Sequence, residues 1–436
     1  MKRRLGKMEM AEAMTNEHFP FNAVIILRLS SSPAEETLRI LLQYVQRRHP
    51  LLGVHVLKEK KRYWFVSDGT PPIPLKILKR QNNHHWQQVT EEELNCKFDM
   101  LTGPLIRFSY LKGISAEEKS EIVITIQHSI MDAVSTVNFL NEILSVCQEI
   151  ETHGSLGNLD GLESLPLLPP ADVFFPPSFK GVRRKWNVFR FILRQVGDEF
   201  LYRLRTAGKR KPPITLAGRC KILSLQLSRE LTDSLIKRSR QKRLALNIVL
   251  TAAFMMAAHK HLYQGRPIPL RHINTADLRP YLIPPLDPQY FGSYFAMVRI
   301  TLGMKENPAL WDAAQALNKT IYSFLKKGDK FCAHLLSYPM MSALFKFKSF
   351  RMASTAMSFT GPLLLERKYG KLGVRDLHAF VSNFGLGPEY TAMVRLFDNR
   401  VYWDILYLDS DMDHEQAVVI ADEIRTILES AVGEES

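Results

Sequence analysis

The segment EIVITIQ (121–127) runs directly into HSIMDA (128–133). The first seven residues are mostly apolar and β-branched, a composition typical of a strand at the centre of a sheet. We therefore expect His128 at the end of a central strand, where a side chain can face a cleft. Asp132 follows four residues later, at the predicted start of a helix that reaches about Val146, so its carboxylate can stiffen the turn that carries the imidazole.

Histidine is the natural general base for taking a proton from a hydroxyl or an amine near neutral pH. The spacing of His128 and Asp132 nevertheless occurs often by chance in a chain with 13 histidines. The spacing alone therefore leaves a chance occurrence and a general base both open.

The rest of the chain alternates strands with helices. Strands are predicted at 21–29, 54–56, 63–66, 105–111 and 220–227, and helices after Ser32, after Ser228 and over 247–262. In the first of these helices Ser32 is the expected N-cap, and the apolar face consists of Leu38, Leu41, Leu42 and Val45.

A proline-rich segment at 151–177 interrupts this alternation, which then starts again. A chain of 436 residues exceeds the ~250–300 residues at which single cores stop growing. We therefore expect an α/β (α+β) protein of two similar domains: an N-terminal domain at 1–165, a linker with a basic amphipathic segment at 166–215, and a C-terminal domain at 216–436.

Most of the net charge of +14 comes from one segment. Residues 178–211 contain 11 Lys and Arg, the last of them Lys209, Arg210 and Lys211, against two acids, so this segment carries 11 − 2 = +9. Its apolar residues recur at helical spacing: Phe189, Ile192, Leu193, Val196, Phe200 and Leu204. One interpretation is a helix that packs its apolar stripe on its own domain and exposes its arginines. The other is a surface for an anionic partner: an anionic membrane, an acidic carrier protein or the phosphates of coenzyme A. No nucleic-acid-binding module is recognisable.

The composition argues against several classes of protein. No apolar run is long enough to span a membrane, and Lys7, Glu9 and Glu12 interrupt any signal-peptide core. The four cysteines are scattered, and His84 and His85 lack a third ligand, so we expect neither a disulfide framework nor a metal site. A cytoplasmic protein is expected, with peripheral attachment to a membrane as an alternative.

Five stretches in order resemble motifs of the chloramphenicol acetyltransferase and condensation-domain superfamily, nearest to its polyketide-associated and alcohol acyltransferase members. QHSIMDA (127–133) resembles HHxxxDG, the motif that carries the family's base. The other four stretches are residues 21–29 together with RRHPLL (47–52), FDMLTGPLIR (98–107), DLRP (277–280) together with FGS (291–293), and VSNFG (381–385). Together they cover most of the chain.

The resemblance implies two similar chloramphenicol-acetyltransferase-like domains with a channel between them. It implies an acyltransferase in which His128 is the base and no cofactor is bound. An acyl-CoA or an acyl-carrier protein is the donor, and an alcohol or amine is the acceptor, with lipid-like molecules among the candidates. Asp132 is then structural and pairs with Arg279 from the second half of the chain, while Ser382, Asn383 and Gly385 line the channel.

The chain departs from the motif at two positions. Gln127 replaces the first histidine, and Ala133 replaces the final glycine, which adds a methyl group near the channel. An enzyme is favoured because His128, Asp132 and Arg279 are all present. A catalytically degenerate binding protein of the same fold is the alternative.

Overall fold

The computed structural model describes residues 1–60, 62–114, 118–156, 161–207, 214–304, 308–348 and 350–433. Lys209, Arg210 and Lys211 of the predicted basic segment lie outside the described residues, as does part of the predicted proline-rich linker at 157–160.

The chain forms two compact units, and neither is one continuous stretch. The first contains Met1–Phe174, Arg279–Tyr294 and Leu363–Ser382, and the second contains Phe175–Leu278, Phe295–Pro362 and Asn383–Ser436. Two segments of the C-terminal half thus belong to the first unit, whereas the sequence predicted that 216–436 would form a domain of its own. One reason is the pairing of β13 (Leu372–Val381) with β2 (Asn22–Leu29).

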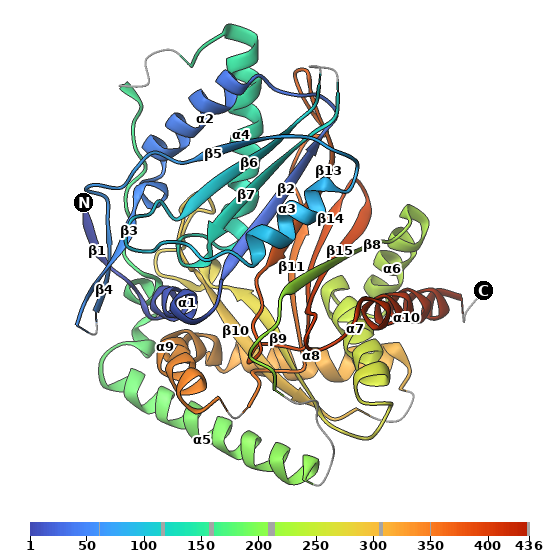
Figure 1. Cartoon of the computed structure of the whole chain (residues 1–436). Coiled ribbons are helices and arrows are strands. Elements are labelled where there is room, and N and C mark those ends of the chain that lie inside the picture. The colour runs from blue at the N-terminus through green and yellow to red at the C-terminus, as the bar shows by residue number, and fades with distance from the viewer. Residues whose placement is uncertain are drawn as a thin grey trace. The chain divides into compact units, whose positions relative to one another are not determined.

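The first unit contains a six-stranded sheet of order β12-β13-β2-β7-β6-β5. In Figure 1 the late, orange strand β13 lies beside the early, blue strand β2. Every residue of β7 (Ser120–Gln127) is buried, as the β-branched composition predicts for a central strand. The other sheet strands are β5 (Leu75–Lys79), β6 (Ile106–Lys112) and β12 (Lys368–Tyr369). A small sheet joins β1 (Lys2–Arg4), β4 (Arg62–Val66) and β3 (His55–Glu59).

Four helices belong to this unit: α1 (Lys7–His18), α2 (Glu35–Arg48), α3 (His85–Leu94) and α4 (Ala133–His153). The helix α3 packs against β2 and β7, while α2 packs against α4. The predicted apolar face of α2 is buried. The predicted cap is wrong, because α2 begins after Ala34 and the Ser32 hydroxyl instead donates to the carbonyl of Glu118. The helix α4 is longer than predicted and ends at Gly154, whose φ of 74° suits glycine.

The second unit contains another six-stranded sheet, of order β10-β9-β11-β14-β15-β8. Its strands are β8 (Cys220–Gln226), β9 (Leu270–Asp277), β10 (Phe295–Leu302), β11 (Thr355–Pro362), β14 (Tyr390–Phe397) and β15 (Arg400–Leu408). Its helices are α5 (Gly181–Thr206), α6 (Arg229–Gln241), α7 (Leu246–Leu262), α8 (Leu310–Lys326), α9 (Asp329–Phe347) and α10 (His414–Gly433). Ser228 caps α6 as predicted, since its Oγ accepts from the amide of Leu231.

Two sheets covered by helices confirm the mixed α/β class and the two similar domains predicted from the sequence. The channel predicted between them stays a prediction. Over the described part of the chain, every helix is too short or too polar to cross a bilayer.

The helix α5 contradicts one sequence expectation. The apolar stripe, which one of the two interpretations packs on its own domain, is exposed, and within α5 only Phe191 and Thr206 are buried. Helical spacing predicts that a stripe exists but not which side of the helix faces the protein.

Candidate active site

A short turn at the end of β7 carries His128, and Gln127 holds this turn in place. The Gln127 Oε1 accepts a hydrogen bond of 2.8 Å from the amide of Ser129, and also one from the Ser129 hydroxyl. Its Nε2 donates to the carbonyls of Glu12 (3.3 Å) and Phe21 (3.4 Å). The amide of His128 donates to the same Phe21 carbonyl. Gln127 therefore connects the histidine turn to α1 and to the residue before β2.

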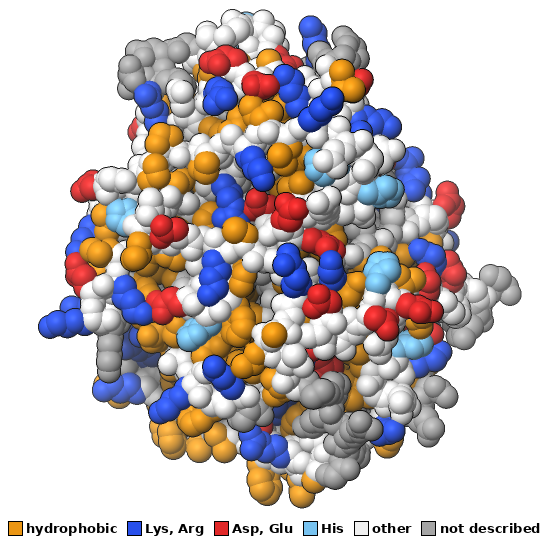
Figure 2. Space-filling view, viewed as in Figure 1, with side chains coloured by type: hydrophobic (Ala, Val, Ile, Leu, Met, Phe, Trp, Pro, Cys, Tyr) orange, Lys and Arg blue, Asp and Glu red, His pale blue; other side chains and the backbone are white. Residues whose placement is uncertain are grey.

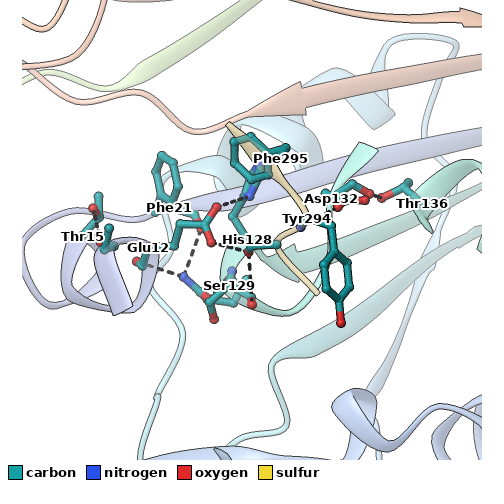
Figure 3. Close-up of polar contacts among 12 residues, drawn as sticks. Glu12, Thr15, Phe21, His128, Ser129, Asp132, Thr136, Tyr294 and Phe295 are labelled. Carbon is teal, nitrogen blue, oxygen red and sulfur yellow. Dashed lines mark hydrogen bonds and ion pairs between the residues drawn. The ribbon is translucent and has the colours of Figure 1, made fainter. Parts of the chain in front are cut away.

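The His128 ring lies against a buried carboxylate from α1. Its Nδ1 is 2.8 Å from Oε1 of Glu12, and Figure 3 shows the two side chains directed toward one another. The Glu12 side chain is 4% exposed, whereas 15% of the His128 side chain remains exposed. The Phe21 ring packs on the imidazole, with ring centroids 5.3 Å apart. The ring thus has a fixed orientation and retains some access to solvent.

Burial and charge together set the protonation of this pair. Burial alone would lower the pKa of His128, but the Glu12 carboxylate reverses this, so that the net pKa is raised above its usual 6.5. Burial raises the pKa of Glu12, and His128 and Ser293 only partly offset that effect.

Two acids on α1 have different partners. The Glu9 carboxylate pairs with Arg3 through two contacts of 2.8 and 2.9 Å and accepts a bond from the amide of Gly6, at the start of the helix. One turn later, Glu12 faces His128 and accepts a bond of 2.5 Å from the Ser293 hydroxyl. Glu9 therefore stabilises the helix start, whereas Glu12 belongs to the candidate site.

Asp132 is directed away from the imidazole and is fully engaged by other groups. Its Oδ1 accepts from the amide of Ser135 and so caps α4. Its Oδ2 accepts from Nη1 of Arg279 at 2.8 Å and from the amide of Tyr294 at 3.0 Å. Figure 3 shows Asp132 on the side of Thr136 rather than on that of Glu12. The ion pair predicted between Asp132 and Arg279 is confirmed.

The arginine of this pair is also fixed. Its side chain is 2% exposed, and Nη2 donates to the carbonyl of Tyr290 at 3.1 Å. The guanidinium also lies over the Tyr294 ring, 4.9 Å from its centroid. Arg279 therefore supports the start of α4 from within the same unit.

Comparisons of the sequence match two family models to separate parts of the chain. Residues 6–160 match the model of the condensation domain, and residues 217–346 match the model of the phthiocerol/phthiodiolone dimycocerosyl transferase C-terminus. A search of curated protein sequences gives no match.

Comparisons of the structure extend over the whole chain. Polyketide synthase associated protein 5 from Mycobacterium tuberculosis aligns with a TM-score of 0.70 at 15% identity, covering 98% of both chains. The chain has the fold of the chloramphenicol acetyltransferase and condensation-domain superfamily. Trichothecene 15-O-acetyltransferase from Fusarium sporotrichioides aligns with a TM-score of 0.74 at 13% identity, covering 99% of this chain and 95% of that one. The first condensation domain of the CDA synthetase aligns with a TM-score of 0.70 at 12% identity, covering 100% of this chain and 97% of that one.

Several motifs of the superfamily have a local structural role in this chain. The His49 ring stacks on Phe291 at 4.2 Å, and its Nε2 is 2.7 Å from Glu142. Asp99 accepts bonds from the turn that follows it, which lowers the pKa of its carboxyl. At Gly103, with φ of +64°, a Cβ would lie 2.7 Å from the carbonyl of Val54, so only glycine fits.

The residues predicted to line the channel have local contacts as well. The Ser382 hydroxyl donates to the carbonyl of Leu94, and the Asn383 side chain donates to that of Pro388. A Cβ on Gly385 would lie 1.9 Å from the carbonyl of Thr215. Ala133 is exposed at the first position of α4. A channel role for these four residues stays a prediction.

Sequence reasoning missed Glu12 and gave Ser293 no contact with the site. Residues Met8–Asn16 of α1 are all buried, so no apolar stripe marks an inward face on this helix. Two acids within a Met- and Ala-rich helix are the available signal, because a buried carboxylate requires a partner.

Proposed function

We propose that this chain is an acyltransferase that moves an acyl group from a thioester donor to a hydroxyl or amine acceptor, with His128 as the general base. The observation that carries the proposal is the pairing of Nδ1 of His128 with the buried Glu12. The matches to the two family models support the reaction class, and the donor is an acyl-CoA or an acyl-carrier protein.

The proposed chemistry needs one proton acceptor and no covalent enzyme intermediate. Because Glu12 engages Nδ1, Nε2 takes the proton of the acceptor as its oxygen or nitrogen attacks the thioester carbonyl. When the tetrahedral intermediate collapses, the C–S bond breaks and the imidazolium returns the proton to the leaving thiolate. Binding both substrates together supplies much of the rate, because the attack becomes effectively unimolecular.

Glu12 acts in this scheme as a positioning residue. The carboxylate fixes the imidazole tautomer and stabilises the imidazolium that forms during attack. Asp132 cannot take over the role of base, because the amides of Ser135 and Tyr294 and the guanidinium of Arg279 occupy its oxygens.

The degenerate binding protein differs from the enzyme in one measurable property, which is turnover. The departure at Gln127 does not favour this alternative, because the glutamine side chain holds the histidine turn through four hydrogen bonds.

The proposal is tested by incubating the protein with acyl-CoAs of increasing chain length and with candidate alcohols and amines, while free thiol is measured. We expect thiol release that depends on both the acceptor and His128. The exposed His84 provides the matched control, and His84→Ala should retain the rate. A protein that binds acyl-CoA without releasing thiol for any acceptor would instead be the degenerate binding protein.

A further inference from the structure

The helix α5 lies on its unit with its polar side. Arg271 pairs with Glu199 at 2.7 Å and lies over the Tyr202 ring at 3.7 Å. Thr301 donates to Asp198 at 2.8 Å, and Arg299 donates to Gln195 at 3.1 Å. Both acids of the helix are therefore occupied by the protein.

The opposite side of α5 is apolar and exposed. At 100° per residue, Val182, Trp186, Phe189, Leu193, Val196, Phe200 and Leu204 share one face, and they are 81, 59, 50, 55, 60, 66 and 63% exposed. Ile192 and Leu201 widen this face on its two sides and are 40 and 49% exposed. Figure 2 shows hydrophobic side chains mixed with Lys and Arg at the lower margin, where Figure 1 places α5. A contiguous apolar surface of this extent is typical of an interaction site.

Cations border the apolar face along both sides. Lys185 and Arg203 lie on one side, and Arg183 and Arg190 lie on the other, and all four are exposed. We propose that this outward face of α5 docks on the surface of an anionic membrane, with its apolar side chains in the headgroup region and its cations at the lipid phosphates. This inference does not depend on the proposed acyl transfer.

The pattern of charge favours a membrane over a second copy of the chain. Two copies of α5 paired through this face would bring the bordering cations together, whereas anionic headgroups neutralise them. The apolar face is also broader than the narrow seam of a helix pair, because Ile192 and Leu201 extend it. Trp186 adds a side chain that is enriched at membrane interfaces.

The test measures binding to vesicles of pure phosphatidylcholine and of phosphatidylcholine mixed with phosphatidylglycerol. We expect binding to the mixed vesicles that weakens with salt, because screening limits such attraction to about 8 Å at physiological ionic strength. The triple variant Arg183→Glu, Lys185→Glu and Arg190→Glu should bind at least about 100-fold more weakly, since each cation near the surface contributes about 5-fold. The matched control replaces three exposed cations on α6 and α8 with glutamate: Lys237→Glu, Arg240→Glu and Lys319→Glu. This variant should bind like the wild type.

A second variant tests the apolar face itself. The triple Phe189→Ser, Leu193→Ser and Phe200→Ser should lose binding to mixed vesicles, with far-UV circular dichroism confirming that the fold is kept. Equal binding of the wild type and both α5 variants would overturn the proposal. So would a dimer in sedimentation analysis that the serine variant abolishes, because the face would then bind a second copy. Binding to a purified acidic carrier protein but not to mixed vesicles would also overturn it.

Discussion

The Nδ1 of His128 lies 2.8 Å from the Oε1 of Glu12, a buried residue of the first helix. This contact joins two segments that are far apart in the sequence, and Ser293 holds the other carboxylate oxygen. The contact gives the imidazole its orientation and raises its pKa despite the burial of the ring.

Replacing Glu12 should change the pH dependence of the reaction. The base must be neutral to accept a proton, so the acid limb of kcat/KM should lie above pH 6.5, in the direction of the raised pKa of His128. Glu12→Gln removes the charge that raises this pKa, so the limb should move to lower pH. The measurement is kcat/KM across the pH range with one acyl-CoA and one acceptor.

The control for this experiment is Glu9→Gln, one turn earlier on the same helix. It should destabilise the start of α1, because the buried Arg3 loses its carboxylate, and it should move the limb less than Glu12→Gln does, because Glu9 acts on Glu12 and not directly on His128. If Glu12→Gln and Glu9→Gln leave the same limb as the wild type, Glu12 has no influence on the base.

The same pair predicts how stability depends on pH. The folded state raises the pKa of His128, so its contribution to stability is complete below about pH 6.5 and disappears as the pH rises through the raised pKa. We expect the free energy of unfolding in urea to fall over this window more steeply for the wild type than for Glu12→Gln. Parallel pH profiles for the two proteins would contradict the assignment.

Asp132→Ala should lose stability and activity together. The change removes the cap of α4 and leaves the buried Arg279 without its carboxylate, at a cost of about 3–5 kcal/mol. Asp132→Asn can keep the cap and should lose less. The measurement is chemical denaturation, and a double-mutant cycle with Arg279→Met isolates the pair. A loss below about 1 kcal/mol for Asp132→Ala would show that the pair contributes little.

Gln127→Leu tests whether this departure from the family motif is itself functional. The substitution leaves the buried amide of Ser129 without its acceptor, which should cost about 1–3 kcal/mol. The activity should fall as well, because the turn that carries His128 loses its connection to α1. If Gln127→Leu unfolds at the same denaturant concentration and turns over at the wild-type rate, the glutamine is not needed to hold the turn.

Local patterns predicted much of the fold and part of the site. The composition of β7 predicts a buried central strand, and that strand delivers His128 to its end. The family motif predicts the pair of Asp132 with Arg279. Glu12 escaped prediction because its partner lies far along the chain and because its helix is buried all round. No local signal shows that Leu363–Ser382 returns to the first unit, since strand pairing decides this.

The α5 helix shows a different limit of sequence patterns. The helical spacing of its apolar residues is predicted correctly. Which side of the helix faces the protein, however, depends on Arg271, Arg299 and Thr301 of the second unit, which bind the polar side of the helix. These partners lie outside the helix in the sequence, so the spacing of residues within the helix does not reveal them.

The central claim is that His128 is the general base, and it is tested most directly by the rate of acceptor-dependent thiol release from acyl-CoA in His128→Ala. The account predicts that the rate falls by about 10²–10⁴-fold while the circular dichroism spectrum stays that of the folded protein, as in His84→Ala. A His128→Ala protein that releases thiol at the wild-type rate with the same acceptor would contradict the account.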